Sequence, residues 1–165
     1  SPRTHMFLTV PLAEGIFAVD PGFGALAPRA PVPLHDAAAA RSGSETHWMA
    51  RDGQFRVLRA GTSEKVIDCW ASTLERENPA DFELGNHYTA THPASPFLHR
   101  IMLRALTDDG RVAVMNRDVT IRRAGVAQAL RLADRAALQA LLLEHFGIDL
   151  PEVARLRVPA IPEWD

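Results

Sequence analysis

Two short β-prone runs near the start of the chain constrain its fold most. Residues 6–10 and 16–19 are mostly aliphatic or aromatic, and residues 11–15 between them, Pro-Leu-Ala-Glu-Gly, favour a turn. An antiparallel hairpin would bring His5, which precedes the first run, close to Asp20, which follows the second. An imidazole gains and loses protons near neutral pH, and a carboxylate beside it fixes its tautomer. We therefore predict a hydrogen bond between these two side chains.

Further β-prone segments, separated by Gly, Pro and Asp, fill the rest of the first half of the chain. Asp52-Gly53 stands between two alternating runs, which is a strong hairpin signal. Such spacing is typical of a barrel or a sandwich, and we interpret it as an antiparallel β-barrel. The expected strands are residues 5–11, 16–20, 31–35, 45–51, 54–60 and 64–71.

A change in composition over residues 72–79, where charge rises and apolar content falls, indicates a connection between two domains, 1–78 and 79–165. A helix is expected to begin at Pro79 after Asn78 as its cap and to stop at His92-Pro93. Its inward-facing residues would be Phe82, Leu84 and Tyr88.

The second domain is expected to continue with two strands and a helix. The strands are residues 99–107 and 111–123, joined at 108–110. The helix has Asp134 as its N-cap and Gly147 just beyond its end, and its apolar stripe is Leu138, Leu141, Leu142 and either His145 or Phe146. The predicted fold class is therefore α/β of the α+β type, an antiparallel β-barrel domain followed by a small α/β lid domain.

Composition excludes several classes of function. The chain has 165 residues, 47% of them hydrophobic and 23% charged, and a net charge of -2, without the basic excess of a nucleic-acid binder. One cysteine permits no internal disulfide, and no long uncharged apolar run provides a membrane span or signal peptide. The histidines lack the spacing of a zinc motif, so no metal is expected. These features indicate a cytoplasmic globular protein.

Four segments in this order, RTHMFLTV, FAVDPGFG, NHYTATHPASPF and EHFGIDL, resemble the arylamine N-acetyltransferases. The resemblance covers nearly the whole chain and implies the second and third domains of such an enzyme, on a cysteine-protease-like catalytic scaffold. That family also has a helical first domain with an Arg-Gly-Gly-X-Cys nucleophile, a motif that these residues lack. Because residues 1–3 lead almost at once into a strand, we expect a C-terminal portion whose partner is that helical segment.

The resemblance implies a Cys-His-Asp triad, with His5 and Asp20 catalytic. A cysteine thiolate would take acetyl from acetyl-CoA as cosubstrate, and an arylamine, arylhydroxylamine or hydrazine would then attack the thioester. Five residues match positions at the family's substrate and CoA site, although Pro21 beside them stands where that family commonly has Val. They are Thr4, Gly22, Phe23, Gly24 and Phe97.

Cys69 is the single cysteine, and it lies in the β-prone run 66–70 with no helix start or Gly-rich elbow around it. Free cysteine usually behaves as a small buried hydrophobe, so we predict a largely buried structural residue and not the nucleophile. Two alternative functions remain open. They are an amide synthase on the same scaffold and a ligand-binding module without catalysis.

Overall fold

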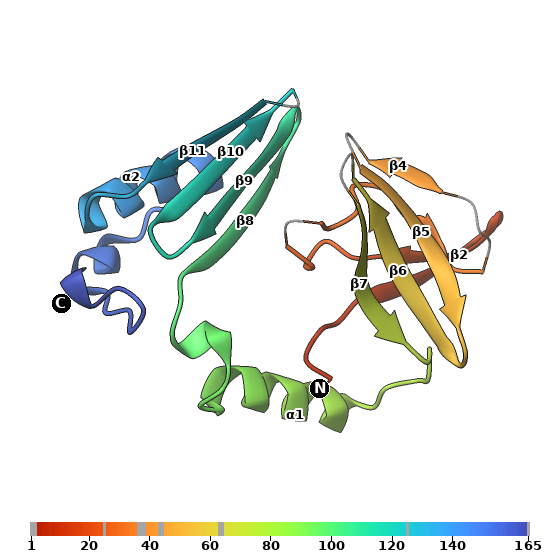
Figure 1. Ribbon diagram of the computed structural model, residues 1–165. Helices are drawn as coiled ribbons and strands as arrows, with labels where there is room; N and C mark the ends of the chain where they lie inside the picture. The colour runs from red at the N-terminus through yellow and green to blue at the C-terminus, as the bar shows by residue number, and fades with distance from the viewer. Residues whose placement is uncertain are drawn as a thin grey trace. The chain divides into compact units, whose positions relative to one another are not determined.

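The computed structural model describes residues 3–24, 26–35, 39–42, 45–62, 65–124 and 126–164. These residues form two compact units, Ser1–Gly85 and Asn86–Asp165. The boundary falls inside helix α1 (Pro79–Thr91), which therefore contributes residues to both units (Figure 1).

The first unit begins with the predicted hairpin, which is confirmed. Strand β1 (Leu8–Leu12) pairs antiparallel with β2 (Gly15–Val19), with Leu8 opposite Val19. The turn needs glycine at its end because Gly15 has a φ of 140°, a conformation that side chains disfavour. Strand β3 (Val32–Pro33) extends this sheet on the other side of β2.

A second antiparallel sheet of the first unit has the order β4-β5-β6-β7. Its strands are β4 (Ala40–Ser42), β5 (Glu45–Asp52), β6 (Phe55–Gly61) and β7 (Val66–Ser72). The predicted Asp-Gly turn joins β5 to β6, whereas the short β4 has no counterpart among the predicted strands. In β7 the register shifts, because Leu58 faces Trp70 while Arg59 faces Asp68, so Cys69 is the extra residue of a β-bulge.

One apolar core joins the two sheets of the first unit. Its buried members come from β2, β3, β5, β6 and the segment after β3: Ala18, Val32, Leu34, Met49 and Leu58. Complete burial of a side chain such as Leu58 contributes roughly 1.5–3 kcal/mol. The expected barrel domain is thus built as two antiparallel sheets that share one core (Figure 1).

Helix α1 starts at Pro79 as predicted, and the Asp81 carboxylate accepts a hydrogen bond from the Asn78 backbone N–H at 2.7 Å. The prediction that Phe82 and Leu84 face inward is wrong, since they are 48% and 68% exposed. Residues two apart lie on different faces of a helix, so this pair cannot form one buried stripe. Tyr88 is half-buried and stacks on His92 at 4.3 Å between ring centroids.

The second unit contains a four-stranded antiparallel sheet of order β11-β10-β9-β8. The predicted single strand 111–123 is wrong, because Asn116 adopts a φ of 56° and turns the chain between two strands. The last strand was not predicted either. The strands are β8 (Met102–Thr107), β9 (Gly110–Met115), β10 (Asp118–Arg123) and β11 (Val126–Arg131).

Helix α2 (Arg135–Phe146) covers one face of this sheet (Figure 1) and agrees with its prediction. The Asp134 side chain accepts from Ala137 N, Gly147 adopts a φ of 65°, and the predicted leucine stripe is buried. The stripe packs on Val112, Val114 and Val119 of the sheet. Short 3-10 helices η1 (Pro96–Leu98), η2 (Pro151–Arg155) and η3 (Pro162–Trp164) complete the unit. Among the described residues no helix is long and apolar enough to span a membrane.

Candidate active site

The open end of the β1–β2 hairpin carries the predicted pair. His5 Nε2 lies 2.8 Å from Asp20 Oδ2, so the predicted hydrogen bond is confirmed. The Asp20 side chain is almost completely buried, whereas 31% of the His5 side chain is exposed. Across the described part of the chain, His5 Nδ1 has no hydrogen-bond partner. One nitrogen of the imidazole is therefore anchored to a carboxylate, and the ring as a whole stays partly exposed.

Asp20 is held by three groups. Besides His5, the Trp70 indole N–H donates to Oδ2 at 2.7 Å and the Gly22 backbone N–H donates to Oδ1 at 3.1 Å. Burial raises the pKa of Asp20. These hydrogen bonds and the proximity of His5 together lower the pKa by more than burial raises it, so the net pKa lies below its usual value of 3.8. Asp20 is therefore a carboxylate at neutral pH despite its burial.

Trp70 is the site residue that sequence reasoning missed. It lies in β7 next to the bulge at Cys69, and its ring stacks on Phe7 with 4.1 Å between centroids and 19° between planes. The sequence signal for Trp70 was only an aromatic residue in an apolar strand. A partly buried indole N–H needs an acceptor, but the sequence does not reveal which acceptor it finds.

The Gly22-Phe23-Gly24 segment borders the pair. The Phe23 ring meets the His5 ring edge to face at 5.3 Å and 73°. Gly24 has a φ of 87°, where glycine is favoured, whereas Gly22 contributes its backbone N–H to Asp20. The structure therefore brings Gly22 and Phe23 against the pair, with the turn at Gly24 following directly.

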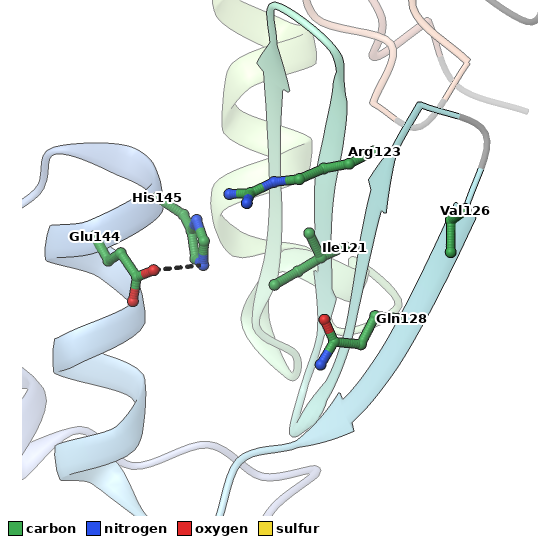
Figure 2. A pocket seen from close by; sticks show the side chains of 6 residues that line it. All are labelled: Ile121, Arg123, Val126, Gln128, Glu144 and His145. Carbon is green, nitrogen blue, oxygen red and sulfur yellow. Dashed lines mark ion pairs between the residues drawn. The ribbon is translucent and has the colours of Figure 1, made fainter.

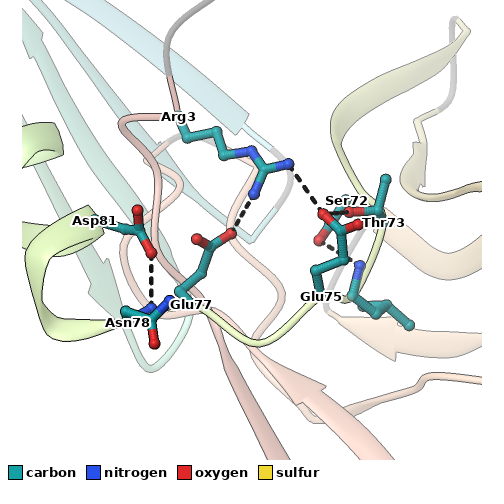
Figure 3. Close-up of polar contacts among 8 residues, drawn as sticks. Arg3, Ser72, Thr73, Glu75, Glu77, Asn78 and Asp81 are labelled. Atoms are coloured by element: carbon teal, nitrogen blue, oxygen red, sulfur yellow. Dashed lines mark hydrogen bonds and ion pairs between the residues drawn. The ribbon is translucent and has the colours of Figure 1, made fainter.

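The chain enters the site through an ion-paired segment. Arg3 donates to Glu77 at 2.7 Å and to Glu75 at 3.2 Å (Figure 3). A Cβ at Gly85 would lie 2.9 Å from the Arg3 carbonyl oxygen, so glycine lets this segment lie against α1. Exposed ion pairs stabilise little individually, and here they tie Arg3, two residues before His5, to the segment after β7. Thr4 within this segment is exposed.

Cys69 is half-buried at its bulge, less buried than predicted, because the bulge leaves it outside the regular alternation of the strand. Burial, followed by the neighbouring carboxylates of Asp20 and Asp68, raises the pKa of the thiol from 9.0 to about 11. A thiol rather than a thiolate stands there at neutral pH, and a thiol is a poor nucleophile.

Phe97 lies in η1 of the second unit and is 60% exposed, so it is not a buried core aromatic. The segment before it is anchored by the buried Ser95, whose hydroxyl donates to the Thr89 carbonyl at 2.6 Å. Within the residues that the structure describes, no group of three or more His, Cys, Asp or Glu side chains is arranged to hold a metal ion.

Comparison with known proteins identifies the family of this arrangement. A family model described as N-acetyltransferase matches residues 1–155. The arylamine N-acetyltransferase of Mycobacterium tuberculosis is 32% identical over 154 residues, which are 92% of this chain and 54% of the relative. The Escherichia coli arylamine N-acetyltransferase is 29% identical over 153 residues, 92% of this chain and 54% of the relative.

A solved structure agrees. The arylamine N-acetyltransferase of Mycobacterium marinum, determined in complex with CoA, superposes with a TM-score of 0.84 at 29% identity, over 91% of this chain and 56% of that one. The chain thus spans about half the length of the relatives that it matches. Because the family model extends over nearly the whole sequence, the chain belongs to the arylamine N-acetyltransferase family.

Proposed function

We propose that this chain is the part of an arylamine N-acetyltransferase that supplies the catalytic base and its orienting carboxylate. The reaction transfers acetyl from acetyl-CoA to an arylamine, arylhydroxylamine or hydrazine through an acetyl-cysteine intermediate. The observation that carries the proposal is the 2.8 Å hydrogen bond between His5 and the buried Asp20. The CoA complex of the Mycobacterium marinum relative supports the choice of donor.

In the first half of the reaction, His5 Nδ1 takes the proton of a cysteine thiol supplied by a helical segment outside these residues. The thiolate attacks the thioester carbonyl of acetyl-CoA, and the CoA thiolate leaves with a proton returned by His5. Asp20, held ionised by Trp70 and Gly22, stabilises the imidazolium that exists between these proton transfers.

In the second half, the amine attacks the acetyl-cysteine, and His5 takes a proton from the attacking nitrogen and returns one to the cysteine sulfur. The nitrogen lone pair of an arylamine is the nucleophile, and its ring needs an apolar surface. Phe23, in contact with His5, supplies such a surface. By the family resemblance, we assign substrate and CoA binding to Thr4, Gly22, Gly24 and Phe97 as well.

The two domains have different roles in this proposal. We assign residues 1–78 to a barrel domain that carries the catalytic pair and residues 79–165 to a lid domain that carries Phe97. The helical segment with the nucleophile is the partner. Exposed apolar side chains on α1, Phe82 and Leu84, favour such a partner, because a helix without a buried residue gains little from packing by itself.

Complementation in trans tests this function. The chain is co-expressed with the N-terminal portion of the Mycobacterium tuberculosis relative, which supplies an Arg-Gly-Gly-X-Cys segment by the family resemblance. Incubation with radiolabelled acetyl-CoA is expected to leave a hydroxylamine-sensitive label on the cysteine of that portion, and addition of an arylamine is expected to remove the label as N-acetylarylamine.

The chain alone is the control, and it should gain no label on Cys69. A complex of the two parts that binds CoA but never becomes labelled would contradict the enzyme and favour a ligand-binding module. Stoichiometric labelling of Cys69 in the isolated chain would contradict the assignment of the nucleophile.

A further inference from the structure

Strand β11 forms one edge of the second unit's sheet. Its inner edge pairs with β10 over all six residues, from Val126 opposite Arg123 to Arg131 opposite Asp118. Its outer edge pairs with no strand of the described chain, and every residue of β11 is exposed. A row of unpaired backbone N–H and C=O groups on a regular strand is a template for pairing with another strand.

Other edge strands in the two units carry features that oppose such pairing. Strand β1 contains Pro11, β4 has three residues, and β7 is interrupted by its bulge at Cys69 and carries the charge of Asp68. Strand β8, at the opposite edge of the same sheet as β11, has four of its six residues half-buried. By contrast, β11 has no proline or bulge, and its one charged residue, Arg131, is at its end.

The side chains of β11 divide between two faces. Val126 and Gln128 line a hollow together with Ile121 and with His145 of α2, so the even-numbered residues face α2 (Figure 2). Alternation along a strand places Ala127 and Ala129 on the opposite face. One face therefore presents Val126, Gln128 and Leu130, and the other presents two alanines followed by Arg131 at the end of the strand.

We propose that β11 is a homodimer interface, in which two copies of this chain pair antiparallel through β11 with Gln128 opposite Gln128 of the second copy. In this register Val126 faces Leu130 of the second copy, and Ala127 faces Ala129. A twofold axis perpendicular to the sheet passes between the two glutamines, and the two four-stranded sheets become one continuous sheet.

The sequence of β11 fits the register centred on Gln128 better than the next possible register, which is centred on Ala129. Apolar residues meet apolar residues, the two amides can exchange hydrogen bonds, and no charge is placed opposite another charge. A register centred on Ala129 would instead put Gln128 opposite Leu130 and Arg131 opposite Ala127. In the favoured register Arg131 stays outside the paired segment and keeps its ion pair with Asp118 at 3.3 Å.

An interface made by residues 126–130 of one strand from each copy is small beside the roughly 1,600 Å² of a standard interface. The dimer should therefore be weak and depend on concentration. Sedimentation velocity of the 165-residue chain over a concentration series measures its dissociation constant directly.

Charge reversal at the twofold axis tests the register. Q128K and Q128E each place two like charges opposite one another, and each is expected to weaken the dimer about tenfold or more. An equimolar mixture of Q128K and Q128E places opposite charges across the axis, so it is expected to associate more strongly than either variant alone. This reciprocal pattern is expected only for a residue that lies opposite the same residue of the second copy.

Gln54, an exposed glutamine in the turn between β5 and β6, provides the matched control. Q54K and Q54E should leave the dissociation constant within twofold of the unsubstituted chain, and far-ultraviolet circular dichroism should show the same fold for all four variants. A chain that stays monomeric throughout the series overturns the proposal and leaves the edge for a strand of a different protein. A dimer that neither charge weakens, or that the mixture does not restore, places the interface elsewhere and also overturns it.

Discussion

The end of β2 and the bulge of β7 each place an acidic group beside the core of the first unit, with opposite results. Asp20 is buried deeply, yet three hydrogen bonds hold its pKa below 3.8. Cys69 is only half-buried, yet burial and two nearby carboxylates raise its pKa to about 11. Burial alone therefore does not decide ionisation. Hydrogen-bond donors do, because they favour the charged form.

The comparison also separates the roles of the two groups. The charge on Asp20 opposes a thiolate at Cys69, whereas the same carboxylate accepts a hydrogen bond from His5. Cys69 is thus held as a thiol beside the carboxylate, which is the state expected of a residue that is not the nucleophile of the proposed reaction.

Asp20→Asn should have the largest effect. The variant keeps the size of the side chain but loses the charge that orients and stabilises the imidazolium, so acetyl transfer by the reconstituted enzyme should fall by about 10³–10⁴-fold. The same variant should lower the pKa of Cys69, since one of the carboxylates that raise it is removed. Iodoacetamide alkylation of Cys69 against pH measures that shift, and near-normal turnover would contradict the triad.

Trp70→Phe should have an intermediate effect. Phenylalanine keeps a ring to stack on Phe7 but removes the indole N–H that Asp20 accepts at 2.7 Å. The pKa of Asp20 should then rise, and the acidic limb of the rate profile should move to higher pH, with a loss of about tenfold in turnover. Hydrogen bonds to a charged group contribute about 1.5–3 kcal/mol, which sets this scale. An unchanged acidic limb would show that Trp70 only fills space.

The residues of the hairpin show how much the sequence can predict. The turn chemistry of residues 11–15 and the alternation of two short runs were sufficient to place His5 next to Asp20. Helix α2 was equally predictable, since its cap, its leucine stripe and Gly147 are all local signals. Long-range partners were not predictable, because the indole of Trp70 reaches Asp20 from fifty residues away in the sequence.

The second unit shows where prediction from the sequence failed. Residues 111–123 contain two β-prone runs separated by Asn-Arg-Asp, and the turn between them has one asparagine in a left-handed conformation. The segment that becomes β11 has alanines and a glutamine where a strand usually has β-branched residues, so its pairing with β10 decides its structure. Phe82 and Leu84 were misassigned because apolar residues on a helix were taken to face a core of this chain.

Acid unfolding should report the state of Asp20 with a smaller effect. Its pKa is lower in the folded protein than the ordinary 3.8, so its contribution to stability is fully present above pH 3.8 and is lost as the pH falls through the folded value. The Asp20→Asn variant has no carboxyl group at this position, so it has no such contribution to lose as the pH falls. Urea unfolding at pH 5 and at pH 3 should therefore show a smaller loss of stability for the variant than for the unsubstituted chain, and equal losses would contradict the lowered pKa.

Cys69→Ser should have the smallest effect. The thiol lies 3.9 Å from the Ile67 carbonyl and also interacts with the Ala60 backbone, and it takes no part in the hydrogen bonds of Asp20. A serine hydroxyl fits the half-exposed bulge, so turnover of the reconstituted enzyme should stay within about twofold and the unfolding free energy should change by about 1 kcal/mol or less. In the unsubstituted chain, alkylation of Cys69 should accelerate only as the pH approaches 11. Rapid alkylation at pH 7 would show that Cys69 is a thiolate at neutral pH, like the ionised Asp20. Together with loss of acetyl transfer in the serine variant, that result would identify Cys69 as the nucleophile.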